Sequence, residues 1–147
     1  MDPKDIVIEE VKEFSEEVVA AVQHLITLEG SHYQPFSDDD LKEMIQNPHG
    51  FLYIARDAST KAIAGMVFLA IYRIPYAKKA YIDDVVIDEK FRGRGVATRL
   101  LEKSIEEAKK HQVSYVMLTA HPTRVANNLY EKLGFQKRET NVYRLYI

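Results

Sequence analysis

The sequence predicts a mixed α/β fold around one central sheet, and two observations lead to this prediction. Segments rich in Ile, Val, Tyr and Phe follow one another with short connections at residues 51–57, 63–74 and 79–89, which is typical of an antiparallel meander. The hydrophobic period then becomes helical over residues 95–112, and a further strand pattern follows at 114–120. Strand, helix and strand in this order predict a parallel pair with a right-handed crossover. The expected sheet is therefore mixed and mostly antiparallel, with about four helices on its faces.

Two of these helices are predicted before the meander. A short strand at residues 6–11 leads to a helix with Ser15 as its N-cap and acids in its first turn. A second, shorter helix starts at Ser37 or Asp38. We interpret the three consecutive acids at this point as a capped helix start rather than a ligand site, because negative charge stabilises the first turn of a helix.

The C-terminal part is predicted to add one helix and two closing strands. The helix covers residues 123–133, and the strand patterns lie at residues 135–138 and 141–147. We expect the two strands to extend the central sheet.

Composition limits the class of protein. The 147 residues, 46% hydrophobic and 29% charged, fit one globular domain over residues 1–147. A net charge of -2 argues against nucleic acid as a partner. Cys is absent, which excludes disulfides, thiolate metal sites and Cys nucleophiles. The N-terminus lacks the pattern of a signal peptide, and no run approaches the roughly 20 apolar residues of a membrane span. We expect a cytoplasmic protein without a membrane partner.

The connection between the third meander strand and the long helix is the first candidate binding site. It runs through Arg92-Gly93-Arg94-Gly95-Val96-Ala97. Two glycines permit positive φ, and a helix N-terminus offers unpaired N–H donors and a partial positive charge. Such a turn suits a phosphate or pyrophosphate group. The alternative is a turn that needs glycine only for its shape.

Spacing separates the known phosphate-binding turns. A Walker A loop is absent, and a dinucleotide fingerprint would need a third glycine where Thr98 stands. The pattern Arg-x-x-Gly-x-Ala fits at Arg92, Gly95 and Ala97. With its flanking strand and helix, residues 80–108, this pattern resembles motif A of the GNAT superfamily of acyl-CoA-dependent N-acyltransferases. Residues 124–135, RVANNLYEKLGF, resemble the second signature of the same family.

The resemblance implies an activity and a set of roles. It implies an N-acetyltransferase that uses acetyl-CoA, needs no metal, and transfers acetyl to a primary amine of a small molecule or a peptide or protein N-terminus, by direct attack without a covalent enzyme intermediate. It further implies that Tyr130 protonates the leaving thiolate and that Asp83 or Asp84 accepts the amine proton, directly or through water. The implied cofactor contacts are the backbone of Val85, Val86 and Ile87, and the N–H groups of Arg92, Gly93, Arg94, Gly95, Val96 and Ala97.

The proposed catalytic residues each have a structural alternative. Gly134 is well placed as a left-handed helix cap that would bring Phe135 against Tyr130 in a Schellman motif, so Tyr130 could serve packing alone. Strand alternation would send Asp83 and Asp84 to opposite faces, so at most one would face the acceptor. The other would cap a loop or pair with a cation such as Lys78, Lys79 or Arg73.

One position departs from the family pattern. Many members place an asparagine seven residues before the tyrosine, where this chain has Thr123. Asn127 lies one turn before Tyr130 and is the preferred cofactor contact, with a solvated asparagine as the alternative.

The acceptor is the least determined part of the prediction. His32, Tyr33, Tyr72 and Tyr76 offer an aromatic wall, and the acids at 38–40 would favour a cationic amine. The five His residues show no metal-ligand spacing. Two further questions stay open: whether the chain is a monomer or a homodimer, and whether it is instead a catalytically idle acyl-CoA sensor.

Overall fold

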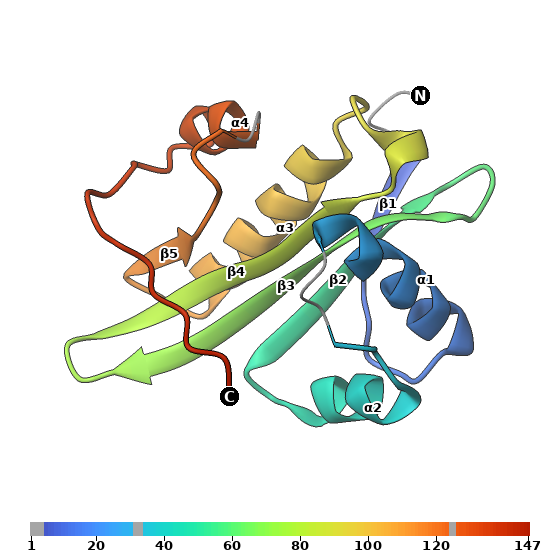
Figure 1. The fold of residues 1–147 in the computed structure, drawn as a ribbon, viewed down its shortest axis with the longest axis horizontal. Helices are drawn as coiled ribbons and strands as arrows, with labels where there is room; N and C mark the ends of the chain where they lie inside the picture. Colours follow the sequence, from blue (N-terminus) through green and yellow to red (C-terminus); the bar gives the residue numbers. More distant parts are fainter. Residues whose placement is uncertain (1–4, 31–33, 124–125) are drawn as a thin grey trace.

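A five-stranded mixed sheet forms the centre of the protein (Figure 1). The structure is a computed structural model and describes residues 5–30, 34–123 and 126–147. The strands stand in the order of the chain: β1 (Ile6–Glu10), β2 (Gly50–Asp57), β3 (Ile63–Ile74), β4 (Ala77–Ile87) and β5 (Tyr115–Leu118). The first four strands pair antiparallel, and β4 pairs with β5 in parallel. The predicted meander and parallel pair are confirmed.

Helices cover both faces of this sheet (Figure 1). The two helices α1 (Glu16–Ile26) and α2 (Asp38–Gln46) pack on one face, which we call the α1/α2 face. On the opposite face, the α3 face, lie α3 (Val96–Lys110) and the apolar side of α4 (Ala126–Lys132). Short 3-10 turns follow α1 at Thr27–Glu29 and β4 at Glu89–Phe91. The two faces bury separate apolar clusters, as expected for a layered α/β domain.

The predicted helix starts are present. Ser15 caps α1 by accepting a hydrogen bond from the backbone N of Val18 at 3.4 Å. At α2, Ser37 Oγ accepts from the backbone N of Asp40 at 3.2 Å, while Asp40 Oδ2 accepts from the backbone N of Ser37 at 2.8 Å. This reciprocal pair is a capping box, so the acids at the start of α2 serve the helix, as predicted.

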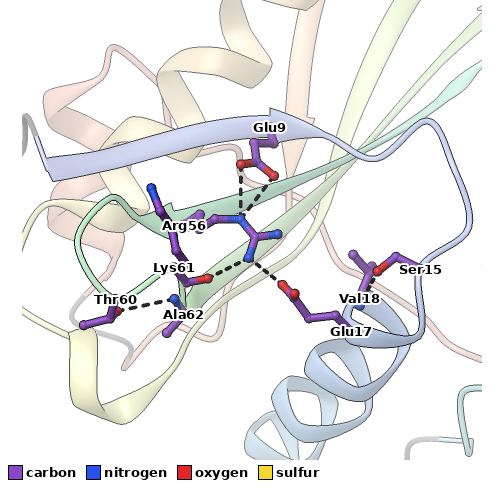
Figure 2. A network of polar contacts seen from close by, with 8 residues as sticks. All are labelled: Glu9, Ser15, Glu17, Val18, Arg56, Thr60, Lys61 and Ala62. Atoms are coloured by element: carbon purple, nitrogen blue, oxygen red, sulfur yellow. Dashed lines mark hydrogen bonds and ion pairs between the residues drawn. The ribbon is translucent and has the colours of Figure 1, made fainter.

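One arginine joins β1, α1 and the β2–β3 turn (Figure 2). Arg56 Nε donates to both carboxylate oxygens of Glu9, at 3.1 and 3.3 Å. One of its terminal nitrogens donates to Glu17 and to the carbonyl oxygen of Lys61, the latter at 2.6 Å. A planar guanidinium can serve three acceptors in different directions at once. It therefore fixes the start of α1 relative to the sheet.

The two closing strands predicted at residues 135–138 and 141–147 are absent. The chain after α4 has no helix or strand and crosses the sheet near β4 in Figure 1. The prediction was wrong because a strand needs a partner edge, and β-propensity describes only how a side chain fits such an edge. Among the described residues, no helix combines the length and the apolar character that crossing a membrane requires.

Candidate active site

A β-bulge distorts the middle of β4. Met66 of β3 stands opposite Val86, but Phe68, two residues further along, stands opposite Asp83. Two residues of β4, Asp84 and Val85, therefore face a single residue of β3. Asp84 has a φ of 51°, in the left-handed region that few residues other than Gly, Asn and Asp adopt. The bulge changes which side chains point to which face of the sheet.

Because of the bulge, regular strand alternation cannot be used to place the side chains of Asp83 and Asp84, as the sequence prediction did. Asp83 lies directly opposite Phe68, which packs in the α1/α2 cluster, so Asp83 points to the α1/α2 face. Val85 packs in the α3 cluster and Val86 in the α1/α2 cluster. In an undistorted strand Val86 would share a face with Ile82, which packs in the α3 cluster. Asp84 occupies the point where the alternation breaks.

Both acids have raised pKa values. Their side chains reach solvent, yet surrounding protein displaces part of their hydration, and this raises the pKa of Asp83 and of Asp84. The negative charges of Asp83 and Glu29 raise the pKa of Asp84 further. The positive charge of Arg144 partly offsets the shift at Asp83. A carboxylate with a raised pKa is a better proton acceptor near neutral pH than an ordinary one.

The cation near these acids is not one of those predicted. Lys79 Nζ lies over the rings of Tyr72 and Tyr115, at 5.2 and 5.8 Å from their centroids, and 3.7 Å from Met117 Sδ. No ion pair joins Lys78, Lys79 or Arg73 to either acid within the described residues. Arg144 and Glu29 act on the pKa values of these acids because the C-terminal chain and the turn after α1 pass close to them, and the sequence does not reveal these paths.

The glycine turn has the conformation that the sequence predicts. Gly93 has a φ of 74° and Gly95 a φ of 78°, both left-handed. Gly95 is the N-cap residue of α3 and offers no side chain to the helix. Because Arg99 is the first residue to donate back into the helix, at 3.1 Å to Gly95 O, the N–H groups before it have no intrahelical acceptor.

Positive charge and open space surround this turn. A Cβ built on Gly93 would meet no other heavy atom within 4 Å. Arg94 lies over the ring of Phe91, with its guanidinium carbon 5.8 Å from the ring centroid, and Arg92 Nε donates to Ile87 O at 3.3 Å. The turn therefore combines free N–H donors, a helix N-terminus and two guanidinium groups, which fits an anionic group such as a pyrophosphate.

The strand that precedes the turn is partly unpaired. β5 pairs with β4 only from Lys79 to Ile82, so the stretch from Asp83 to Ile87 has no strand neighbour on that side in the described structure. The predicted pantetheine contacts Val85, Val86 and Ile87 all lie in this stretch. Their main chain can still accept an extended ligand carrying amide groups.

Tyr130 lies in α4 on the α3 face. With Leu129 and Leu133 it packs against the cluster that also holds Val85 and Ile87. Gly134, with a φ of 95°, follows the helix, and the backbone N of Gly134 donates to Glu131 O at 3.0 Å. The backbone N of Phe135 donates to Tyr130 O, also at 3.0 Å, and the two bonds together form the predicted Schellman motif. Tyr130 therefore has a packing role, and it lies on the same face of the sheet as Val85 and Ile87. Its predicted role as an acid stays a prediction.

Asn127 has a structural role that the sequence did not predict. Its side-chain amide nitrogen donates to the carbonyl oxygens of His121 and Pro122, both at 3.0 Å. It thereby closes the loop that leads into α4. With these donors in use, a contact between Asn127 and the cofactor would have to use the amide oxygen as acceptor. Thr123 is engaged locally, with its hydroxyl 2.8 Å from His121 Nδ1.

Some residues that the sequence predicted for the site do not lie near the bulge or the glycine turn, or lie outside the described residues. His32 and Tyr33 lie outside the described residues, as does Arg124 of the second signature. Tyr72 and Tyr76 stand at the β3–β4 hairpin, where Tyr76 lies next to Tyr115 rather than next to the acids. Of the residues that the structure describes, no group of three or more His, Asp or Glu side chains could hold a metal ion.

A contact between α1 and the end of β4 was missed by the sequence prediction. His24 Nε2 lies 2.9 Å from Asp88 Oδ2. Asp88 also caps the 3-10 turn after β4, because its Oδ1 accepts from the backbone N of Lys90 at 2.9 Å. The side chains of Asp88 and His24 thus connect α1 to the segment that enters the glycine turn. Only the Asp-x-Lys turn pattern was visible in the sequence.

A separate hollow lies away from these residues. It has a volume of about 230 Å³ and lies between α2 and the adjoining parts of β1 and β2, lined by residues such as Val11, Leu41 and Phe51. None of the predicted catalytic or cofactor residues lines it. We therefore assign the site by the bulge, the unpaired part of β4 and the glycine turn.

Comparison with known proteins defines the class of the protein. Three solved structures share the fold. An acetyltransferase of Trypanosoma brucei has a TM-score of 0.79 and 23% identity, covering 97% of this chain and 100% of that one. Glucosamine-6-phosphate N-acetyltransferase of Arabidopsis thaliana has a TM-score of 0.81 and 18% identity, covering 97% and 99%. An aminoglycoside acetyltransferase from an uncultured soil sample has a TM-score of 0.82 and 15% identity, covering 99% and 97%.

The sequence comparisons identify the family. An uncharacterized N-acetyltransferase of Methanocaldococcus jannaschii is 39% identical over 61 residues, which are 41% of this chain and 27% of that protein. The match thus spans about a quarter of that relative's length. The model of the acetyltransferase (GNAT) family matches residues 19–135. The chain belongs to this family of acetyltransferases.

Proposed function

We propose that this protein transfers an acetyl group from acetyl-CoA to a primary amine of a small molecule or of a peptide or protein N-terminus. The observation that carries the proposal is the continuity of one segment: the bulged and partly unpaired half of β4 leads through two left-handed glycines into the N-terminus of α3. This segment places main-chain groups for an extended ligand next to donors for an anion. The two acids lie at its other end.

The residues of this segment fit acetyl-CoA. The main chain of Val85, Val86 and Ile87 would hold the pantetheine amides, and the N–H groups from Gly93 to Ala97 would hold the pyrophosphate. The predicted contact from the backbone N of Arg92 is not available in this structure, because that N donates to Glu89 O at 3.5 Å. When bound, acetyl-CoA supplies an acyl group activated as a thioester. Binding of the long cofactor along β4 would position that group beside the bulge, so that the acceptor need only approach in the correct orientation.

Side chains of the protein accept a proton from the amine and donate one to the leaving sulfur. An amine attacks only when it is deprotonated, and a carboxylate oxygen of Asp84 or Asp83 accepts that proton directly or through a water molecule. As the new nitrogen–carbon bond forms and the carbon–sulfur bond breaks, the Tyr130 hydroxyl donates its proton to the departing sulfur. The nitrogen loses its second proton to solvent as the amide forms, the tyrosine regains a proton from solvent, and the carboxylic acid then releases its proton. A backbone N–H at the bulge would stabilise the charge that develops on the carbonyl oxygen.

Charge near the bulge favours a cationic acceptor. Asp83 and Asp84 lie close enough to influence each other, and Glu29, at the end of the 3-10 turn after α1, adds a third negative charge. An alkylamine is a cation at neutral pH, so this group of acids attracts it and then accepts its proton. The acids at the start of α2 contribute less, because Asp40 is engaged by the capping box.

The test has two parts. Calorimetry measures the binding of acetyl-CoA, and a panel of amines is then screened with acetyl-CoA while the free thiol is followed. The proposal predicts binding and thiol release with cationic primary amines. Binding without thiol release for every amine would favour an acyl-CoA sensor instead. Absence of acetyl-CoA binding would overturn both readings.

A further inference from the structure

His24, in the last turn of α1, lies against the segment that leads into the glycine turn. Its Nε2 is 2.9 Å from Asp88 Oδ2. A carboxylate oxygen only accepts hydrogen bonds, so Nε2 is the donor. The side chain of His24 is 58% exposed, and that of Asp88 is 16% exposed. The contact therefore joins an exposed donor of α1 to a mostly buried acceptor at the end of β4.

Asp88 is bound through both its main chain and its carboxylate. Its backbone N donates to Ala64 O of β3 at 2.8 Å, and its carbonyl oxygen accepts from the backbone N of Phe91 at 2.9 Å. One carboxylate oxygen, Oδ1, accepts from the backbone N of Lys90 at 2.9 Å, and the other is bound by His24. Asp88 thus connects β3, the 3-10 turn after β4, and α1, shortly before the chain reaches the glycines.

The glycine turn needs such support, because its own residues do not determine its conformation. Gly93 and Gly95 have φ values of 74° and 78°, but glycine adopts negative φ about as readily. A Cβ placed on Gly93 would meet no heavy atom beyond its chain neighbours within 4 Å, so close packing does not hold this residue either. The ring of Phe91 in the 3-10 turn supports the guanidinium of Arg94, at 5.8 Å. The conformation of the glycine turn therefore depends on the segment before it.

α1 is a fixed reference for this segment. Its buried face packs Val18, Val22 and Leu25 against the sheet. Near its start, Glu17 is bound by Arg56 of β2. A helix that is fixed along its length in this way can hold a side chain of its last turn in one place.

We infer that His24 is a positioning residue for the pyrophosphate-binding turn and acts on it through Asp88. The inference rests on the proposed function, which makes acetyl-CoA the ligand of this turn. His24 holds the Asp88 carboxylate, the carboxylate holds the 3-10 turn, and the 3-10 turn sets the direction in which the chain enters Gly93. Without His24 the turn samples further conformations, and its N–H groups converge less often on the anion. A site whose binding conformation is less populated has a proportionally lower apparent affinity.

The first experiment compares two amide substitutions of His24. The side-chain nitrogen of Gln stands as many bonds from Cβ as Nε2 of His, whereas that of Asn stands a bond closer. His24→Gln can therefore keep the bond to Asp88, and His24→Asn cannot. We expect His24→Asn to weaken acetyl-CoA binding roughly 3- to 10-fold in calorimetry, and His24→Gln to stay within about twofold of the parent. Turnover at saturating acetyl-CoA should change by less than about twofold in both, because His24 acts on binding through another residue.

The matched control is His111→Asn. His111 also pairs with an acid, with its Nε2 3.3 Å from Glu107 Oε1, but it follows the last residue of α3. Because α3 has 15 residues, this end lies about 20 Å from the glycine turn. His111→Asn should leave acetyl-CoA affinity unchanged. A loss equal to that of His24→Asn would show that affinity follows overall stability, and would overturn the inference.

A double-mutant cycle tests the route through Asp88. In an Asp88→Ala chain the partner of His24 is absent, so adding His24→Asn should cause no further loss of acetyl-CoA affinity. If the losses from the two substitutions add instead, His24 does not act through Asp88, and the inference is wrong.

A second experiment needs no ligand. Nuclear magnetic resonance relaxation of the free protein gives order parameters for the backbone N–H groups of residues 93–97. These should be lower in His24→Asn than in the parent and in His24→Gln. If the parent fails to bind acetyl-CoA but shows this difference, the proposed function fails and the positioning of the turn by His24 stands. Unchanged order parameters in His24→Asn, or unchanged acetyl-CoA affinity where the parent binds, would overturn the inference.

Discussion

Phe135 is joined to Tyr130 twice at the end of α4: its backbone N donates to Tyr130 O at 3.0 Å, and the two rings meet edge to face with centroids 6.2 Å apart. The ring of Tyr130 therefore has a packing role that is independent of its hydroxyl. Tyr130→Phe keeps the ring and removes the proton donor. We expect turnover to fall by roughly 10- to 1000-fold while acetyl-CoA affinity and stability change little, as measured by steady-state kinetics, calorimetry and thermal unfolding.

The matched control for this variant changes the packing and keeps the hydroxyl. Phe135→Leu should lower stability, because it removes the ring contact, and should retain most of the turnover. If Tyr130→Phe turns over within about twofold of the parent, Tyr130 is a packing residue and not the acid.

The second prediction follows from the conformation of the glycine turn. Gly95→Leu should abolish acetyl-CoA binding in calorimetry, because a side chain at the N-cap of α3 would occupy the space beside the free N–H groups and the backbone is left-handed. The control is Gly30→Leu, since Gly30 also has a positive φ, of 128°, but lies in the loop after α1. It shares the backbone strain and should retain acetyl-CoA affinity. Equal affinity of both variants would show that the turn does not hold the cofactor.

Local rules predicted much of the fold and part of the site. The left-handed glycines at 93, 95 and 134 follow from φ preferences and helix termination, which depend on a few adjacent residues. The change of period after Ile87 marked the start of α3 for the same reason. The family signatures then linked these local features to acetyl transfer.

Nonlocal features could not be predicted in this way. The bulge at Asp84 depends on which residue of β3 each residue of β4 faces, and sequence alternation assumes a regular strand. The approach of Glu29 and Arg144 to the acids depends on the paths of a loop and of the C-terminal chain. The segment 141–147 has strand-like residues, but its sequence cannot tell whether a partner edge lies within reach.

The raised pKa of Asp84 predicts that removing its charge stabilises the protein. The pKa is raised by desolvation and then by the charges of Asp83 and Glu29, so the folded state disfavours the ionised carboxylate. Asp84→Asn should therefore increase the free energy of unfolding at neutral pH. The gain should disappear as the pH falls below about 4, because the carboxyl is then protonated in both states. Asn also tolerates the left-handed φ of 51°. Thermal unfolding between about pH 3 and pH 8 measures the difference.

Asp57 is the control with the opposite sign. It is 4% exposed, and its Oδ1 accepts hydrogen bonds from the backbone N and the hydroxyl of Ser59, both at 2.8 Å. These bonds lower the pKa of Asp57, so its contribution to stability is present above the unfolded pKa and lost as the pH falls through the folded one. Asp57→Asn should be destabilising at neutral pH, and its deficit should shrink on acidification. Parallel pH profiles for the two variants would contradict at least one of the two assignments.

The network around Arg56 makes the last prediction (Figure 2). The Arg56 side chain is 19% exposed and serves Glu9, Glu17 and the carbonyl oxygen of Lys61 together. Arg56 contacts these acceptors through two separate nitrogens, Nε and one terminal nitrogen, whereas a lysine has a single nitrogen. Arg56→Lys should therefore lower the free energy of unfolding by about 1 to 3 kcal/mol, measured by urea denaturation with an unchanged m-value. The control is Lys110→Ala, which removes ion pairs of a side chain that is 58% exposed and should cost less than about 0.5 kcal/mol. If the two variants lose equal stability, the guanidinium contributes no more than an ordinary surface charge.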